Sequence, residues 1–239
     1  MGTGDDVEEG STVLKRGTKL SAAEVGVLSA MGMEVVPVFR KPRLGIISTG
    51  NELVPVGSTL RTGQIRDVNS HLLLSLCASY GCEGRSYGIV PDEREGILAA
   101  LRRAAAENDA VLLSGGSSAG KADMTAEAIA ELGAVFCHGV AVNPGKPTVL
   151  GEACGKAVFG LPGHPAACWF MTELLVKKYI YALRDETAVA YPVKAELAEH
   201  VSSNHGREEL LCVRLTGGAA VPVYGKSGVI SQLSVADGY

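Results

Sequence analysis

Four short loops in the sequence combine small, acidic and proline residues, which are residue types that bind anions and metal ions. They read STGNEL (48–53), VPDERE (90–95), SGGSSAGKAD (114–123) and LPGHP (161–165). Each loop follows a short apolar run, such as LGII or AVLL, that predicts a buried strand. Because ligands of open parallel sheets bind at the carboxyl ends of the strands, we expect the four loops to gather at one edge.

The loop SGGSSAG (114–120) is the strongest of these signals. Its small residues let backbone N–H groups approach an anion, and the N-terminus of a following helix adds favourable partial charge. The loop has neither the GKS or GKT ending of a Walker loop nor GxGxxG spacing. A flexible linker is the alternative. Because the loop stands directly between an apolar run and a helical pattern, we favour phosphate binding.

Glu52, Asp92 and Asp123 place one carboxylate on each of three loops. Each has a structural alternative, since Asp92 and Asp123 can cap helices and Glu52 can be a solvated loop acid. Their expected convergence beside a phosphate site favours a functional role. Carboxylates in that position suit Mg²⁺, which binds one or two carboxylates together with ligand phosphates.

The segment PGKP (144–147) holds a loop between two prolines, so that Lys146 projects as a point charge. Plain solvent exposure of this lysine is an equally open alternative. His164 lies between Gly163 and Pro165, where it can cap the next helix or contact a ligand, although such a lone histidine is more often structural. The other histidines show no spacing suited to a metal site.

The elements that must position these loops alternate between strand and helix from residue 42 onward. Short apolar runs predict buried strands at residues 44–47, 85–90 and 110–113. Helical spacing predicts helices at residues 69–80, 92–105, 125–132 and 166–183. Asn69 and a capping box of Asp92 and Glu95 are the expected starts of the first two helices. This alternation predicts an α/β fold with a doubly wound, mainly parallel sheet.

Both ends of the chain lack this alternation. Ser21 and Glu24 predict a capping box for a helix from Ala22 to about Met31, with strands expected around VLKRGTKL before it and at VVPVF after it. Beyond Arg184 the runs VKAEL, ELLCVRL, AVPVY and GVISQL predict strands and no helix. We therefore expect an N-terminal segment at 1–41, an α/β domain at 42–184 and an incomplete, small β-rich domain at 185–239.

Composition limits the classes of function. No apolar stretch approaches the roughly 18 to 20 residues that cross a bilayer, and the acidic, glycine-rich start has no signal-peptide pattern, so we expect a cytoplasmic protein. The formal charge is −4, with 22 basic and 26 acidic residues intermixed, so no basic stripe is available for nucleic acid. The 6 cysteines are scattered without a CxxC pair, which predicts reduced, packed thiols.

With these loops in order, the chain resembles the molybdopterin molybdenumtransferase family, the MoeA and gephyrin E-domain proteins of molybdenum cofactor biosynthesis. STGNEL, GQIRDVNS, SGGSSAGKADMT, PGKP and LPGHPAA stand in the family's order at about its spacing. GREELL, GKSG, ISQL and ADGY are similar to motifs of its C-terminal β domain. These C-terminal motifs argue against the single-domain MogA-like adenylyltransferases and the competence-damage-type proteins, which share the central fold.

The resemblance implies binding of adenylylated molybdopterin and insertion of molybdate, with release of AMP, assisted by Mg²⁺. It also implies a homodimer and a possible MogA-like adenylyltransferase partner. By motif position, Glu52, Asp92 and Asp123 would be the catalytic and metal-binding acids. Glycines and Ser117 of the third loop would approach phosphate, Lys146 would attract an anion, and the two prolines of LPGHP would shape an oxyanion loop. The implied ligand-binding residues are Thr49, Gly50, Gly115, Gly116, Ser117, Lys146, Pro162, Gly163 and Pro165.

Three positions near the expected site depart from the family pattern. His164 stands where the family usually reads GNP, Asn143 where it often has a basic residue, and residues 117–119 where it commonly reads VSV within GGVSVG. We also expect the chain to begin after the family's N-terminal region, with its MDGYA-like segment, and to stop before the final strands. Two alternatives to the enzyme therefore stay open: a non-catalytic module that binds the molybdopterin nucleotide, and a molybdopterin adenylyltransferase.

Overall fold

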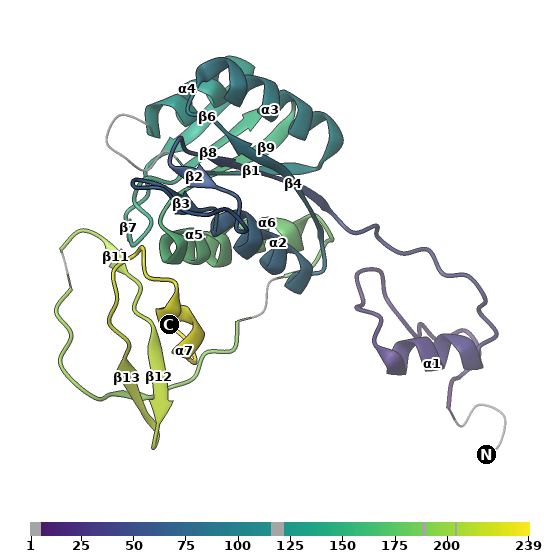
Figure 1. Cartoon of the computed structure of the whole chain (residues 1–239). Coiled ribbons are helices and arrows are strands. Elements are labelled where there is room, and N and C mark those ends of the chain that lie inside the picture. The colour runs from purple at the N-terminus through teal and green to yellow at the C-terminus, as the bar shows by residue number, and fades with distance from the viewer. Residues whose placement is uncertain (1–5, 116–121, 188–189, 204) are drawn as a thin grey trace.

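A six-stranded sheet forms the centre of the molecule in the computed structural model, which describes residues 6–115, 122–187, 190–203 and 205–239 (Figure 1). The strands lie in the order β4 (Glu83–Val90), β1 (Arg43–Thr49), β5 (Ala110–Gly115), β9 (Lys156–Leu161), β8 (Val149–Ala153) and β6 (Gly133–His138). Strands β4, β1, β5 and β9 are mutually parallel, whereas β8 and β6 run antiparallel to their neighbours. The predicted α/β fold with a mainly parallel sheet is confirmed.

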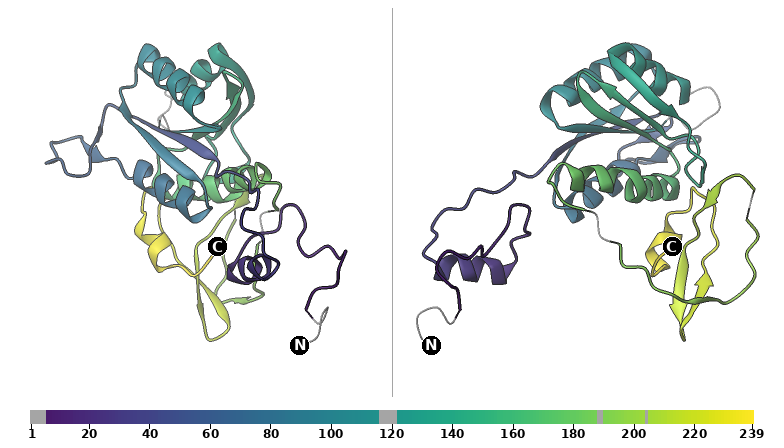
Figure 2. Two further views of the ribbon diagram at one scale, coloured as in Figure 1. Left: turned by 90° about the vertical axis from the view of Figure 1, so that its right-hand side faces the viewer. Right: turned by 180° about the vertical axis from the view of Figure 1, so that it is seen from behind.

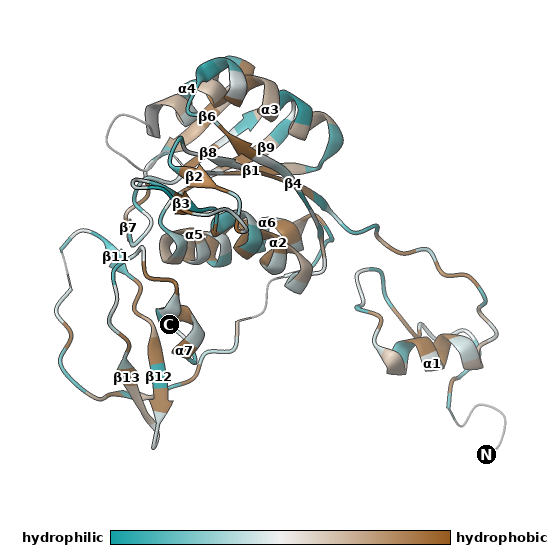
Figure 3. Cartoon of the chain, in the orientation of Figure 1, coloured by the Kyte–Doolittle hydropathy of each residue, from teal (hydrophilic) through white to brown (hydrophobic). Residues whose placement is uncertain are grey.

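Helices cover both faces of the sheet (Figures 1 and 2). One face packs on α2 (Asn69–Ser79), α5 (Pro165–Met171) and α6 (Lys177–Ala182), and the other on α3 (Arg94–Glu107) and α4 (Ala122–Leu132). Alternate residues of each strand enter the two cores, because side chains along a strand point to opposite faces. Leu112 of β5 lies in the core of α2 and α5, and its neighbour Leu113 lies in the core of α3. Figure 3 shows the resulting hydrophobic sheet beneath a hydrophilic outer surface on α3.

Two helices begin differently from the sequence prediction. The cap residue of α2 is Val68, without a side-chain bond, and Asp67 Oδ1 instead accepts the Ser70 backbone N–H at 3.1 Å. Asn69 is therefore not a cap, because its amide is used at the sheet edge. Helix α3 starts at Arg94, after Glu93, which makes no side-chain capping bond. The predicted Asp92 and Glu95 capping box is wrong, since Asp92 contacts the neighbouring loop.

The predicted helix after Pro165 is confirmed as one helical run with a change of winding in its middle. Residues Thr172–Val176 form a π-helical segment between α5 and α6. A π turn admits an extra residue into the helix and shifts the register of the faces on either side. Both flanking helices still bury apolar residues against the sheet, such as Phe170 and Ile180.

The N-terminal segment contains α1 (Ala22–Ala30), and its Ser21 and Glu24 capping box is confirmed. The two predicted strands around it are wrong, since residues 6–42 contain no strand. Val35 is 82% exposed and Val38 is 69% exposed. A strand-forming composition gives no strand here because no neighbouring backbone in the described chain pairs with it. Figures 1 and 2 show the segment to one side of the sheet.

The C-terminal part is a small sheet of β10 (Glu196–Leu197), β13 (Ala219–Pro222) and β12 (Val213–Thr216). The expected strand at GVISQL is wrong, because residues Ser231–Val235 form a short helix, α7, whose Gln232 donates to the Lys226 carbonyl at 3.1 Å. Two short parallel ladders complete the fold, namely β2 (Leu53–Val54) with β3 (Ile65–Arg66) and β7 (Val142–Asn143) with β11 (Glu208–Glu209). Among the described helices, none has the length and apolar character to cross a membrane.

Candidate functional site

The carboxyl ends of β1, β5 and β9 meet at one edge, as expected. Thr49 is the register partner of Gly115, and Ser114 is the partner of Leu161. Gly115 has φ 141°, and a Cβ built there would lie 2.1 Å from the Thr49 carbonyl oxygen. Only glycine fits this close approach of two backbones. The SGGSSAG loop therefore leaves the sheet directly beside Thr49, while Gly116 and Ser117 lie outside the described residues.

A buried hydroxyl and carboxylate cluster lies behind this edge. Ser48 Oγ donates to Asp67 Oδ1 at 3.0 Å and lies 2.8 Å from Ser70 Oγ. The Ser70 hydroxyl donates to the second Asp67 oxygen. All three residues are at most 5% exposed. The cluster fixes the start of α2 against the end of β1, because each buried polar group has a partner inside it.

Asn69 connects two of the four predicted loops. Its Nδ2 donates to Ser114 Oγ at 2.6 Å and to the Gly163 carbonyl at 2.9 Å. The side-chain oxygen Oδ1 is buried and has no hydrogen-bond partner within the described protein. A buried acceptor without a partner costs about 1–3 kcal/mol, which a bound donor would recover. Sequence reasoning took Asn69 for a helix cap, and the GQIRDVNS motif was its only functional signal.

Glu52 and Asp92 lie on adjacent loops, tied together by Asn51. The Asn51 backbone N–H donates to Asp92 Oδ2 at 3.4 Å, and the Asp92 N–H donates to Asn51 Oδ1 at 3.1 Å. Glu52 turns back over Gly50, with Oε1 3.1 Å from the position of a Gly50 Cβ. The Asp123 side chain is outside the described part. Among described residues, no group of three acidic, cysteine or histidine side chains is placed to hold a metal ion.

The LPGHP loop contacts the C-terminal domain. His164 Nδ1 lies 2.7 Å from Ser227 Oγ, and the Ala166 N–H donates to the Ser227 carbonyl at 3.0 Å. His164 is the cap residue of α5 but makes no capping bond with its side chain.

Lys146 of the PGKP loop is exposed, which agrees with plain solvent exposure as well as with anion binding. Its loop leaves β7 through a cis Asn143–Pro144 peptide and packs Gly145 against Met171.

Cys168 lies beneath the edge, completely buried. Burial raises the pKa of its thiol to about 12, although contacts with Ser114 and Thr172 partly oppose this. The thiol is therefore protonated at neutral pH and is unsuited to act as a nucleophile. The edge consequently offers hydrogen-bonding side chains, backbone N–H groups and loop carboxylates. This set can bind an anionic ligand and hold a cation beside it.

Fold and edge together define an α/β ligand-binding domain followed by a small β domain. Residues 45–182 match the family described as the probable molybdopterin binding domain. Residues 194–239 match the MoeA C-terminal region, domain IV. The order of the two matches follows the order of the two parts of the fold.

Known proteins agree with both matches. The chain is 31% identical over 242 residues to a molybdopterin molybdenumtransferase of Staphylococcus epidermidis, covering 98% of this chain and 58% of the relative. It is 35% identical over 199 residues to the Bacillus subtilis molybdopterin molybdenumtransferase, covering 82% and 46%. A crystal structure of the molybdopterin biosynthesis MoeA protein from Pyrococcus horikosii superposes with a TM-score of 0.87 at 40% identity, covering 97% and 57%.

The chain belongs to the MoeA-like molybdopterin molybdenumtransferase family. It spans 46% to 58% of the length of the two curated relatives named above. The resemblance drawn from the ordered loop motifs is therefore confirmed.

Proposed function

We propose that this chain supplies the ligand-binding part of a cytoplasmic enzyme that inserts molybdate into adenylylated molybdopterin with release of AMP. Family membership supports molybdenum cofactor biosynthesis as the setting. The observation that favours ligand binding at the sheet edge is the buried Asn69 amide, which joins Ser114 and Gly163 and keeps one acceptor without a partner in the described protein.

In this proposal different residues of the edge bind different groups of the ligand. Backbone groups from Thr49, Gly50 and Gly115 onward, including Gly116 and Ser117, accommodate phosphate. Lys146 attracts the oxyanion near LPGHP, where Pro162, Gly163 and Pro165 shape the loop. Asn69 Oδ1 accepts a donor from the ligand and thereby gains the partner that it otherwise lacks.

Mg²⁺ belongs to the same proposal. Glu52 and Asp92 fit part of its coordination, since they are oxygen ligands on two loops joined by Asn51. Asp123 would be the third acid. A bound Mg²⁺ supplies positive charge that offsets the charge on the phosphate of departing AMP. The residues of the chain would hold and orient the ligand so that this charge lies beside the bond to be broken.

The test combines ligand identification with turnover. The protein is purified from a host that overproduces the cofactor, the co-purified ligand is identified by mass spectrometry, and AMP release is followed with and without molybdate. Molybdate-dependent AMP release supports the enzyme. Binding of the nucleotide with no AMP release under any condition refutes it and supports the non-catalytic binding module.

One contact favours that second candidate. Asn143 Nδ2 donates to Glu209 at 2.9 Å, so a neutral amide already bonded to a carboxylate occupies the position before PGKP. A charged side chain there would attract an oxyanion more strongly than an amide does. The adenylyltransferase alternative is less favoured, because the C-terminal domain packs on the LPGHP loop and would have no use in that reaction.

The proposal also includes the assembly state and a protein partner. A homodimer and a MogA-like adenylyltransferase partner follow from the family rather than from a contact of this chain. Light scattering during gel filtration tests the dimer: a monomer at tens of micromolar concentration would refute it. Co-elution with a MogA-like protein tests the partner.

A further inference from the structure

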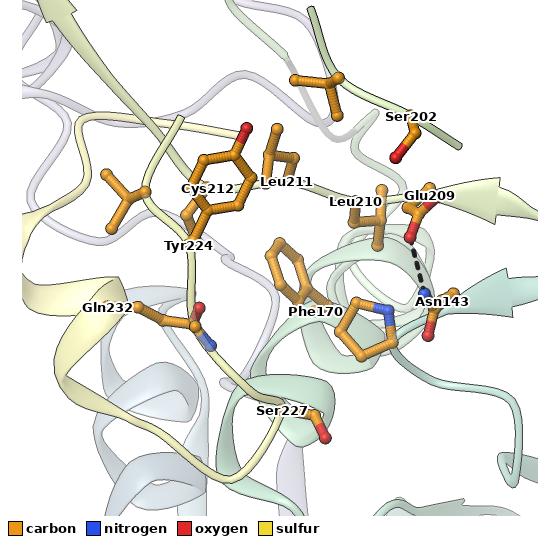
Figure 4. Close-up of a pocket in the computed structure, with 14 residues that line it drawn as sticks. Asn143, Phe170, Ser202, Glu209, Leu210, Leu211, Cys212, Tyr224, Ser227 and Gln232 are labelled. Carbon is orange, nitrogen blue, oxygen red and sulfur yellow. Dashed lines mark hydrogen bonds between the residues drawn. The ribbon is translucent and has the colours of Figure 1, made fainter. Parts of the chain in front are cut away.

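A pocket of about 280 Å³ lies between the α/β domain and the C-terminal domain (Figure 4). Phe170 of α5 and Pro144 of the PGKP loop form one side, and Leu210 and Tyr224 of the C-terminal domain form the other. The two sides are joined by backbone bonds, since the Leu210 N–H donates to the Asn143 carbonyl at 2.8 Å. The pocket is near the lower limit for small-molecule sites, so it suits one ring system of a ligand.

A carboxylate is held at the rim of these apolar walls. Glu209 accepts the Asn143 Nδ2 hydrogen bond at 2.9 Å, and Figure 4 shows this pair to one side of the Phe170 ring. The bond fixes one carboxylate oxygen of Glu209 at the exposed rim of the pocket. A planar group with two parallel N–H donors bonds such a carboxylate at both oxygens, as a guanidinium does. Phe170 and Pro144 provide flat contact for the ring that bears those donors.

Hydrogen-bonded residues connect the pocket with the candidate site. Ser227 lines the pocket and also bonds His164, whose neighbour Gly163 accepts the Asn69 amide. One ligand can therefore place its phosphate at the sheet edge and a ring in the pocket.

We propose that this interdomain pocket binds a flat heterocycle that bears adjacent ring N–H and amino donors, and that Glu209 accepts both. The inference rests on the proposed function, whose ligand has two ring systems. The 2-amino-4-oxo ring of a pterin presents that pair of donors. Adenine does not, because its amino group is next to a ring acceptor. The pocket is thus the pterin subsite, and the adenine lies elsewhere.

Trp169 is a built-in reporter for the test. It is the only tryptophan in the chain, and its ring centroid lies 5.1 Å from that of Phe170, which forms the pocket floor. Titration of the whole chain with free pterin should give saturable quenching of tryptophan emission. Adenine at the same concentrations should bind at least tenfold more weakly. Lumazine, with an oxo group in place of the amino group, should also bind about tenfold more weakly, since a hydrogen bond to a charged acceptor is lost.

Two glutamine variants test whether the pterin ring binds beside Glu209. Glu209→Gln keeps an oxygen that can accept the Asn143 amide but loses the charge and one acceptor, so pterin affinity should fall about tenfold or more. Glu208→Gln is the matched control, because Glu208 lies on the same short strand, is exposed and does not line the pocket. Its pterin affinity should equal that of the wild type. The lumazine comparison needs no variant, so it remains decisive if Glu209→Gln fails to fold.

Several outcomes would overturn the proposal. They are equal binding of pterin, lumazine and adenine, equal effects of the two glutamine variants, and tighter binding of arginine ethyl ester than of pterin, which would indicate an arginine side chain of a protein as the occupant. The same experiments distinguish failure of the proposed function from failure of the pocket assignment. Pterin binding that depends on Glu209 without AMP release leaves the pocket assignment standing, whereas AMP release unaffected by Glu209→Gln removes it.

Discussion

Asn69 is the residue whose loss should separate ligand binding from stability. In Asn69→Ala, Ser114 and Gly163 lose their shared donor, so the free energy of unfolding should fall by about 1–3 kcal/mol. AMP affinity should also fall at least tenfold, because the loops on either side of the edge are no longer held together. Urea denaturation and titration calorimetry with AMP measure the two effects.

Asn108→Ala is the matched control for that substitution. Asn108 is as buried as Asn69, both being 6% exposed, and its Nδ2 donates to the Ala104 carbonyl at 2.8 Å and to Tyr87. It is the C-cap residue of α3, just before β5, and so lies at the opposite end of that strand from Ser114. We expect a similar loss of stability with unchanged AMP affinity. An equal loss of AMP affinity in both variants would mean that Asn69 acts only through stability.

The cysteines differ in a way that alkylation can measure. Burial raises the pKa of the Cys168 thiol to about 12, so at pH 8 it is protonated and unreactive in the folded protein, whereas Cys154 is exposed. Iodoacetamide at pH 8, followed by peptide mass spectrometry, should label Cys154 within minutes and Cys168 only after addition of denaturant. Early labelling of Cys168 would contradict its burial.

The same thiol gives a pH dependence of known sign. An unfolded cysteine has a pKa of about 8.5, so above that pH the unfolded state loses its proton first. Because the folded state then binds more protons than the unfolded state, the contribution of Cys168 to stability falls as pH rises from about 8.5 towards 12.

At the scale of elements, the contact of β1 with β5 sets the geometry of the candidate site. Gly115→Ala should destabilise the protein by more than about 2 kcal/mol, because its Cβ would lie 2.1 Å from the Thr49 carbonyl oxygen. Gly155→Ala separates this clash from backbone strain, since Gly155 has φ 74° and no atom within 4 Å of the added Cβ. We expect about 1–2 kcal/mol there. Thermal denaturation of both variants decides whether the close approach matters.

Elements with a local signal were predictable from the sequence. The apolar run of β5 and the Ser21 capping box of α1 each determine their own structure, and both predictions are confirmed. Residues 35–39 have strand composition but no pairing partner in the described chain, and residues 228–233 alternate as a strand would while forming a turn and α7. Such short runs depend on their neighbours, which a pattern in one segment does not contain.

The candidate site was predictable only in part for the same reason. Loop positions follow from strand ends, so the gathering of Thr49, Gly115 and Pro162 could be expected. Asn69 could not, because its role depends on Ser114 and Gly163, which are distant in the sequence. Its amide, placed at the start of a helix, resembles a cap until the tertiary contacts are known.

At the scale of the whole molecule, the C-terminal domain contacts the α/β domain through three kinds of interaction. Strand β11 pairs with β7, Ser227 bonds the LPGHP loop, and Tyr239 packs edge-on against Trp169 and Phe170 at 5.4 and 5.3 Å between ring centroids. The contacts surround the interdomain pocket. Movement between the domains would therefore change the pocket directly.

The division into domains at residues 184 and 185 stays a prediction, and the structure sharpens its test. Arg184 is half-buried, with Nη1 donating to the Tyr80 carbonyl at 2.6 Å, whereas Lys194 lies in an exposed segment without helix or strand. Between the two domains, trypsin should therefore cut after Lys194 sooner than after Arg184, since a protease needs several residues of extended, accessible backbone. The two products should co-elute from a gel-filtration column, because β7 and β11 remain paired, and separate in mild urea. Cleavage after Arg184 first, or degradation of the whole chain without an intermediate, would contradict two separately folded parts joined by this segment.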